Sequence, residues 1–397
     1  MGFFSRFFGP PTEDQFARLF QKTLAQVGSK RVTTYDKEQF RLTHDDGFTN
    51  LRNFYIEYCK LTGRDRRVYL SRACLLMAQQ PDSPKDFEDA RHDLLPTIRS
   101  RAMLDEVRLQ AEISGSEWKG LPAWPVSEHL MICLVYDLPT AMQFVNDEML
   151  AEWGVSLYEA VEVAKENLEQ RESVIVSVED SFYVVSTGDA YDATRMILID
   201  KIRKLAFEGD PIALPITRET LLLTGVDDKA GLALMIDLAE KSAGESRPIC
   251  PIAHRLVGDE WEPWLPAPDS PLYSRFRLLE VQFLGGAYND QKQLFDKRHE
   301  HTGEDVFVAS FSGIKRAEGI VTYSVWTKGV ASWLPRTDYV GLNNVDTNVT
   351  FFVRWEELQS HVGELLEPLE MYPPRWFVDD FPMVEQIEAM HGEDWSK

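Results

Sequence analysis

The sequence predicts an α+β protein of two or three mixed units whose sheets are largely antiparallel. Candidate helices and strands occur together in each part of the chain, and two consecutive strand-like runs are separated by only three residues, as in a hairpin. At 397 residues the chain is long enough for two or three domains, each with a core of its own. Its 44% of hydrophobic and 27% of charged residues are typical of a globular protein.

An N-terminal α+β unit is expected over residues 11–110, after an apolar tail over residues 1–10. Thr12 and Gln15 form a T-x-x-Q capping box and Gly28 is a helix stop, so the first helix lies between them. The apolar pattern then predicts two short strands and two amphipathic helices, over residues 32–35, 40–43, 51–63 and 65–79.

A middle α+β unit is expected over residues 128–257, after an aperiodic segment, 111–127, that we interpret as a linker or lid. Ser156 and Glu159 form a second capping box, which predicts a helix through residue 168. The other expected elements are strands over 130–136, 142–145, 212–214 and 220–224, a hairpin of 174–178 and 182–186, and helices over 191–205 and 229–241.

A Pro- and Trp-rich segment, 258–275, separates the middle unit from a C-terminal α+β unit over residues 276–397. Its four prolines exclude a helix and a central strand, so the chain is expected to be extended. Gly285-Gly286 is interpreted as a strand-to-helix turn. The remaining expected elements are helices over 288–300 and 356–366, strands over 306–311, 320–326 and 339–342, and a short acidic helix near the end.

The charge of the chain excludes one class of partner. The formal net charge is −22, which disfavours sequence-independent binding to nucleic acid. Between residues 356 and 394 there are 11 acidic residues and one basic residue, Arg375. This acidic tail is either a solvated face that keeps the protein soluble or a docking surface for a basic partner.

The compartment follows from the cysteines and from the absence of targeting signals. The four cysteines, Cys59, Cys74, Cys133 and Cys250, form no CxxC pair and lie in apolar stretches, which predicts buried reduced thiols in the cytoplasm. No apolar run reaches the length of a membrane span. Four phenylalanines of the N-terminal tail could still contact a bilayer surface, and they are Phe3, Phe4, Phe7 and Phe8.

Two similar segments give a candidate polar cleft. Each has Leu-Pro followed by a threonine, an arginine, an acid and a strand, beginning at Leu214 and at Leu334. The acids and arginines either stabilise their own turns or line a shared cleft between the middle and C-terminal units. The cleft hypothesis names Arg218, Glu219, Arg336 and Asp338.

Other chemical signatures are weak. His299 and His301 are the candidate metal ligands, but positions i and i+2 of a helix point apart, so we expect a helix end and no metal. The sequence has no G-x-S-x-G elbow, no phosphate loop and no dinucleotide fingerprint, and we expect no cofactor. Tryptophans at the Pro-rich joins either pack the units together or form an aromatic groove for a ligand. Arg99 and Arg101 are the basic residues to test first for an acidic partner.

Five stretches carry a family resemblance, and they occur in order between residues 93 and 222. They are Asp93-Leu-Leu-Pro-Thr-Ile-Arg-Ser-Arg, Tyr136-Asp followed by Phe144-Val-Asn-Asp-Glu-Met-Leu, Trp153-Gly-Val-Ser, Ala164-Lys-Glu-Asn-Leu and Pro215-Ile-Thr-Arg-Glu-Thr-Leu-Leu. Over about residues 90–260 the chain resembles the YtpQ-like family of uncharacterised bacterial proteins. The resemblance implies a cytosolic bacterial protein with an α+β fold, and it brings no activity, cofactor or catalytic residue. Glu219 stands where the family pattern has Asp.

We therefore expect a cytosolic, non-enzymatic interaction or accessory protein with a protein partner and no nucleic acid. Whether the chain is an enzyme stays open. The first alternative is a hydrolase-like enzyme that uses the polar cleft between the middle and C-terminal units. The second is a peripheral membrane protein held by the phenylalanines of its N-terminus.

Overall fold

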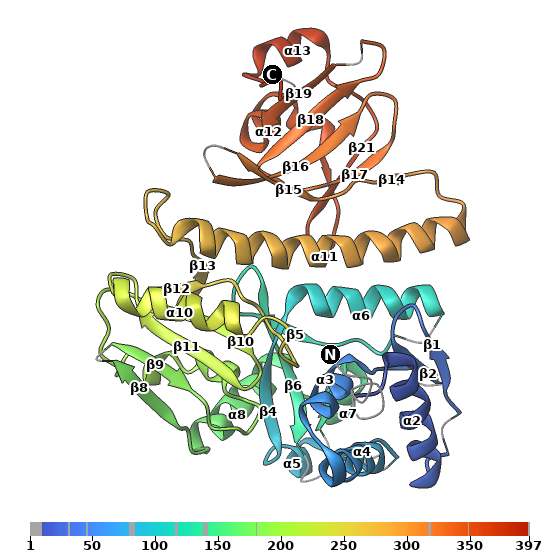
Figure 1. The fold of residues 1–397 in the computed structure, drawn as a ribbon, viewed down its shortest axis with the longest axis vertical. Helices are drawn as coiled ribbons and strands as arrows, with labels where there is room; N and C mark the ends of the chain where they lie inside the picture. Colours follow the sequence, from blue (N-terminus) through green and yellow to red (C-terminus); the bar gives the residue numbers. More distant parts are fainter. Residues whose placement is uncertain are drawn as a thin grey trace, which may run out of the picture.

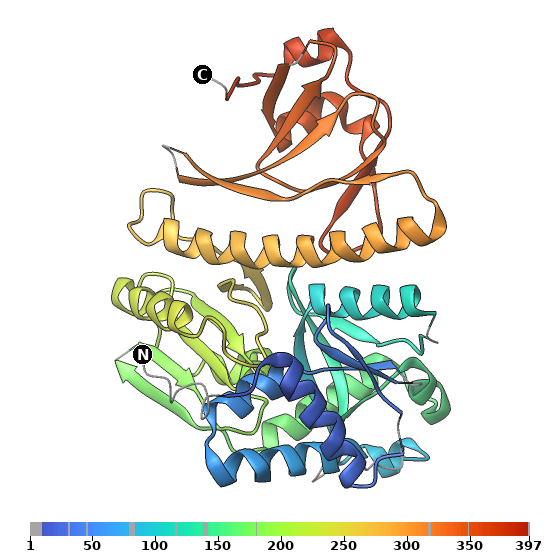
Figure 2. The same ribbon diagram turned by 45° about the vertical axis from the view of Figure 1, so that its right-hand side comes forward.

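The computed structural model describes residues 10–30, 32–44, 47–78, 84–115, 118–137, 142–179, 181–316, 319–347 and 349–395. One long helix, α11 (Tyr273–Thr302), crosses the middle of the molecule (Figure 1). The C-terminal sheets lie on one side of α11, and the N-terminal and middle elements lie on the other (Figure 2). This arrangement makes α11 the element against which the other parts of the molecule meet.

The N-terminal elements form a small α+β unit with its own core. The capping box of Thr12 and Gln15 begins the first helix, as the sequence predicts. Phe16 and Phe20 on one face of this helix are fully buried against Leu42 and Leu51. The elements are α2 (Glu13–Gln26), β1 (Thr34–Asp36), β2 (Arg41–His44), β3 (Gly47–Asn50), α3 (Arg52–Lys60) and α4 (Gly63–Ala78). The three strands form one antiparallel sheet.

The next sheet and the helix that follows its first strand include three elements that the periodicity of the sequence does not predict, β4, α6 and β5. Strand β4 (Leu94–Ser100) is buried at every position and pairs antiparallel with β6 (Leu130–Asp137). Helix α6 (Arg101–Ser114) follows β4 directly, and β5 (Ala123–Pro125) pairs with β6, so residues 111–127 include the end of a helix and a strand as well as connecting chain. The remaining elements are α5 (Phe87–Ala90), β7 (Met142–Phe144), α7 (Asp147–Trp153) and α8 (Leu157–Gln170). The capping box of Ser156 and Glu159 begins α8 as predicted.

A six-stranded antiparallel sheet follows, in the order β13-β12-β10-β11-β9-β8. The predicted hairpin is present as β8 (Ile175–Glu179) and β9 (Phe182–Val185). The predicted helix over 191–205 is instead a 3₁₀ turn, η1 (Ala193–Ile197), and one turn of helix, α9 (Ile199–Ile202). The other elements are β10 (Pro211–Thr217), β11 (Thr220–Gly225), α10 (Lys229–Lys241), β12 (His254–Val257) and β13 (Glu260–Pro263). Strand β13 is the edge strand that the first proline of the 258–275 segment permits.

Helix α11 corrects the interpretation of the two adjacent glycines. It has 30 residues, and Gly285-Gly286 lies inside it, with no strand before the pair. A Cβ atom on Gly286 would have no neighbour within 4 Å, so the space beside this position is open. The glycines reduce the intrinsic stability of the helix, and packing on both sides compensates for that loss.

The C-terminal unit has two four-stranded sheets, β15-β16-β18-β19 and β14-β17-β21-β20. Its strands are β14 (Phe307–Val308), β15 (Ser312–Arg316), β16 (Gly319–Thr327), β17 (Ser332–Pro335), β18 (Tyr339–Asn344), β19 (Val349–Arg354), β20 (Glu367–Pro368) and β21 (Arg375–Val378). Its helices are α12 (Trp355–Val362), η2 (Gly363–Leu365) and α13 (Val384–Ala389). Trp326 and Trp355 are buried in the core between the sheets and α12.

The two Leu-Pro segments fold differently. In the first, β10 and β11 form a tight antiparallel hairpin within one sheet. In the second, β17 and β18 belong to different sheets, so the chain crosses between them. The fold class is the predicted one: an α+β protein in several units, with largely antiparallel sheets and two parallel pairs, β14 with β17 and β16 with β18. Within the described residues, no helix has the length and apolar character needed to cross a bilayer.

Candidate binding cleft

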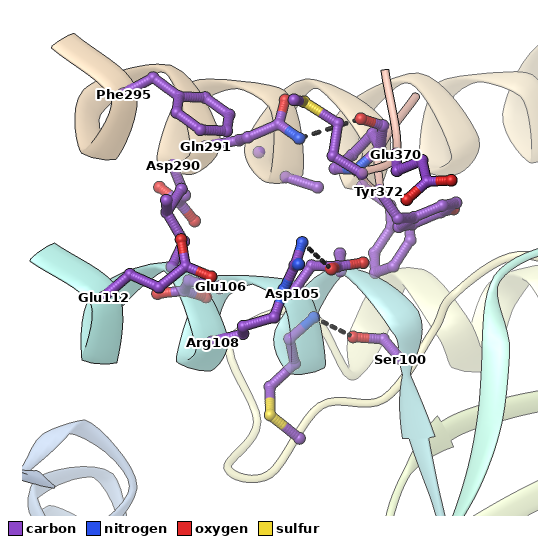
Figure 3. A pocket seen from close by; sticks show the side chains of 18 of the residues that line it. Ser100, Asp105, Glu106, Arg108, Glu112, Asp290, Gln291, Phe295, Glu370 and Tyr372 are labelled. Atoms are coloured by element: carbon purple, nitrogen blue, oxygen red, sulfur yellow. Dashed lines mark hydrogen bonds and ion pairs between the residues drawn. The ribbon is translucent and has the colours of Figure 1, made fainter. Parts of the chain in front are cut away.

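A cleft lies between α6, α11 and the segment that precedes β21. Its volume is about 420 Å³, which is in the range of small-ligand sites. Figure 3 shows α6 on one side, α11 on the other and Tyr372 at one end. The cleft therefore lies between α6 on one side and α11 with the C-terminal unit on the other.

Local sequence places the cleft side chains. The hydroxyl of Ser100 caps α6 by accepting the Met103 N–H at 3.2 Å, which fixes where the helix begins. Positions three and four apart on α6 then face α11, and they are Met103, Glu106, Leu109 and Glu112 with their neighbours Asp105 and Arg108. On α11 the same spacing presents Phe283, Gly286, Ala287, Asp290 and Gln291. The small residues Gly286 and Ala287 leave the space that becomes the cleft.

The cleft is lined by apolar groups and carries an excess of negative charge. Five carboxylates line it, together with two guanidinium groups, those of Arg108 and Arg298. Arg108 already pairs with Asp105 at 3.0 Å, and Arg298 lies 3.4 Å from Glu304 and over the ring of Trp333. The carboxylates without an ion pair among the described residues are those of Glu106, Glu112, Asp290 and Glu370. The free charge of the cleft is therefore negative.

The carboxylates that face one another hold protons more tightly than usual. Burial raises the pKa of Glu106 to about 7, and the negative charge of Asp290 adds to the effect. Burial also raises the pKa of Asp290 and of Asp105. Figure 3 shows Glu106 and Glu112 on the α6 side and Asp290 on the α11 side of the same part of the cleft. A cation between the helices would relieve both the desolvation and the repulsion.

One end of the cleft is held by a network of buried polar groups. The amide of Gln291 donates to the carbonyl of Pro373 at 2.9 Å and accepts from Arg375. The hydroxyl of Tyr372 hydrogen-bonds to His129 Nδ1, and the Arg101 guanidinium lies 4.9 Å above the Tyr372 ring. These contacts fix the segment before β21 against α11, so this wall of the cleft is preformed.

The structure does not bring the four residues of the predicted polar cleft together. Arg218 and Glu219 lie in the β10–β11 turn, and Glu219 pairs with Arg247 at 2.6 Å. Asp338 pairs with Arg277 and accepts from the Thr322 hydroxyl at 2.9 Å, and the Arg336 N–H donates to Tyr288 at 3.2 Å. Figure 1 shows β10 and β11 on one side of α11 and β17 and β18 on the other.

The candidate metal ligands have other partners. His299 Nδ1 lies 3.0 Å from the Val306 carbonyl, and His301 Nδ1 lies 2.7 Å from the Lys297 carbonyl at the end of α11. Over the parts of the chain that the structure describes, no group of three or more His, Cys, Asp or Glu side chains could hold a metal ion. The four phenylalanines of the N-terminal tail lie outside the described residues, so membrane contact through them stays a prediction.

A second cavity, of about 650 Å³, lies between α8, β5 and β13. Trp124 and Tyr158 form its rim, with ring centroids 5.8 Å apart, and both side chains are exposed. Trp261 is buried at its base and donates to the Met196 carbonyl. The sequence left two roles open for the tryptophans at the joins, packing in a core and lining a groove. Trp261 packs in a core and Trp124 lines a groove.

Sequence reasoning missed the carboxylates of the α6–α11 cleft. Glu106 lies in a helix that the periodicity does not predict, and Asp290 lies in a helix whose predicted start is only two residues earlier. A signal was available in the spacing of Asp105, Glu106 and Glu112, which places charges on the same face as Leu109. Comparison of the chain with protein-family models, curated proteins and solved structures finds no match. The likeness to the YtpQ-like family stays a prediction.

Proposed function

We propose that the protein is a non-enzymatic interaction protein whose α6–α11 cleft holds a cationic side chain, a lysine or an arginine, presented by a partner protein. The observation that carries this proposal is the set of opposed carboxylates. Glu106 and Asp290 face each other from two helices, and burial raises the pKa of both. A guanidinium or ammonium group would pair with them directly.

The shape and lining of the cleft support a side chain over a free ion. Phe283, Phe295 and Met371 give the cleft an apolar lining that would contact the methylene stem of lysine or arginine. Glu112 and Glu370 are exposed residues, so their charged ends lie where a partner can reach them. The negative net charge of the chain would speed association with a basic partner.

The test uses a capped peptide with one arginine between two leucines, titrated into the full chain by calorimetry. Because the cation binds the ionised carboxylate, we expect affinity to rise with pH up to about 7, the pKa of Glu106, and binding to release protons below it. Glu106→Gln should weaken binding about 10- to 100-fold, the range for a lost hydrogen bond to a charged group.

Two matched controls decide the result. The same peptide with citrulline in place of arginine keeps the shape and removes the charge, and it should not bind. Glu166→Gln removes an exposed carboxylate of α8 that does not line the cleft, and it should leave binding unchanged. Equal binding of the citrulline peptide, or unchanged binding by Glu106→Gln, contradicts the proposal. Hydrolysis of the peptide that Glu106→Gln abolishes would contradict the non-enzymatic role and would instead assign Glu106 as a catalytic acid.

A further inference from the structure

Two arginines, Arg99 (buried) and Arg218 (half-buried), lie close to each other, and neither pairs with a carboxylate among the described residues. Arg99, on β4, is 8% exposed, and its guanidinium donates only to neutral acceptors, the Thr97 hydroxyl and the Ile98 carbonyl. Arg218, in the β10–β11 turn, directs one N–H to the sulfur of Met142 at 3.2 Å. Its buried Nε has no hydrogen-bond partner among the described residues. Neither guanidinium has an ion pair within the described part of the chain.

The nearest acidic groups are already engaged. Glu219 pairs with Arg247, whose carbonyl accepts the N–H of Arg218, and Asp137 pairs with Arg171 at 3.0 Å. Arg99 and Arg218 also repel one another, and burial together with this repulsion lowers the pKa of Arg99 to about 9. Because an arginine side chain stays cationic at neutral pH, both groups carry their charge at a substantial electrostatic cost.

Strand β7 and Tyr191 surround the two arginines. Phe144 lies under the Arg99 guanidinium at 5.3 Å, and Met142 from the same strand, β7, contacts Arg218. Tyr191 is 1% exposed and interacts electrostatically with both arginines. Its hydroxyl interacts with the carboxylate of Asp137 through charge and a side-chain hydrogen bond. The two guanidinium groups thus have N–H groups left over.

We propose that Arg99 and Arg218 form a binding site for a dianionic phosphate group. The planar fork of a guanidinium matches the oxygens of phosphate. A phosphate carries a charge of about −1.5 to −2 at neutral pH, which matches two arginines, whereas a carboxylate carries only one charge. The site is independent of the proposed function: Arg99 and Ser100 are neighbours on β4 whose side chains point to opposite faces, and only Ser100 lines the α6–α11 cleft.

The experiment titrates inorganic phosphate into the full chain by calorimetry, with chloride at the same ionic strength as the reference. We expect saturable binding that each of Arg99→Met and Arg218→Met weakens about 10- to 100-fold and that the double variant abolishes. Arg255→Met is the matched control, because Arg255 is paired with Asp210 on the same sheet, and it should bind phosphate normally. Near-ultraviolet circular dichroism checks that every variant is folded.

Further titrations distinguish free phosphate from a phosphorylated molecule and define the results that would overturn the proposal. Tighter binding of phosphoserine than of inorganic phosphate would assign a phosphorylated molecule as the source, and the reverse would assign free phosphate. Phosphate binding that persists in the folded double variant would overturn the site. Absence of phosphate binding by the wild-type chain, or a preference for citrate over phosphate, would overturn the proposed ligand. Arg218→Lys, which keeps the charge but removes the fork, should retain only weak binding.

Discussion

Two places in the described structure hold arginines that have little exposure and no carboxylate partner, and the charge is stabilised differently in each. In the C-terminal unit, Arg375 is fully buried, yet every nitrogen of its guanidinium has an acceptor. It donates to the carbonyls of Ala309 at 2.8 Å, Trp333 at 3.0 Å and Tyr288 at 3.3 Å, and to the Gln291 amide. Arg99 and Arg218 also lack a carboxylate, but they have far fewer acceptors and lie near each other.

This difference separates a structural arginine from a candidate binding residue. Arg375, on β21, is joined to α11, to β17 and to Ala309, the residue after β14, through main-chain carbonyls, so its charge is dispersed over dipoles that belong to the fold. The Arg99–Arg218 pair has no equivalent set of dipoles. A buried charge that the protein itself does not satisfy indicates a group that is bound in another state.

The largest expected effect is the loss of Arg375. Arg375→Met removes four hydrogen bonds from a buried site and leaves the Gln291 amide and the Ala309 carbonyl without this donor. We expect the free energy of unfolding to fall by about 3–5 kcal/mol, measured by urea denaturation. Arg255→Met, at a partly exposed ion pair, should change it by less than about 1 kcal/mol. A loss for Arg375→Met as small as that of the control would remove the distinction drawn here.

A smaller effect of opposite sign is expected for Arg99. Arg99→Met replaces an unpaired buried cation with an apolar side chain of similar length, so the ligand-free protein should become more stable by about 1–2 kcal/mol. The measurement is the same urea denaturation, in a buffer without phosphate. Arg72→Met, at an exposed position of α4, serves as the control and should be near neutral. Destabilisation by Arg99→Met would show that Arg99, like Arg375, is structural.

The helices that begin at a capping residue, α2, α8 and α10, were predicted from the sequence. The capping boxes at Thr12 and Ser156 begin helices because the side chains that satisfy the first N–H groups lie within three residues. Helix α10 has the predicted bounds for a similar reason, since Asp228 caps it. These signals need no knowledge of the tertiary structure.

The elements that build the cleft depend on tertiary packing, and sequence reasoning missed or shortened them. Strand β4 contains Pro96 and Arg99, which interrupt an apolar run, yet it is buried because sheet and helices cover both faces. Helix α11 continues through Gly285-Gly286 because it packs against the other units along its length. The opposition of Glu106 and Asp290 follows only from the crossing of α6 and α11.

The proximity of Arg99 and Arg218 also could not be predicted from the sequence. The sequence nominated Arg99 for an acidic partner and Arg218 for a polar cleft, but for separate reasons. Their proximity arises where β4 and the β10–β11 turn meet near β7, and no spacing in the chain encodes it. The sequence therefore pointed to each arginine separately, but it did not predict that the two lie together.

The smallest expected effect concerns Glu106. A carboxylate without an ion pair can become neutral by binding a proton, which lowers the free-energy cost of its burial. An arginine cannot lose its proton near neutral pH, so it has no such route. The pKa of Glu106 is raised from 4.5 to about 7 in the folded protein, so between these values the folded state binds more protons than the unfolded state. The free energy of unfolding should therefore fall as the pH rises from about 4.5 to about 7. For a partly solvated group we expect Glu106 to contribute about 1 kcal/mol to this fall.

The measurement is urea denaturation at several pH values, compared with Glu106→Gln. The amide of this variant does not titrate, so the variant should lose that part of the pH dependence and be more stable than the wild type at about pH 8. Glu166→Gln, on the exposed face of α8, should keep the wild-type slope. Asp290→Asn should also flatten the slope, since it removes both its own raised pKa and its repulsion of Glu106. Parallel curves for the wild type and Glu106→Gln would mean that Glu106 titrates like a solvated carboxylate, and the opposed carboxylates would then no longer favour a cation in the cleft.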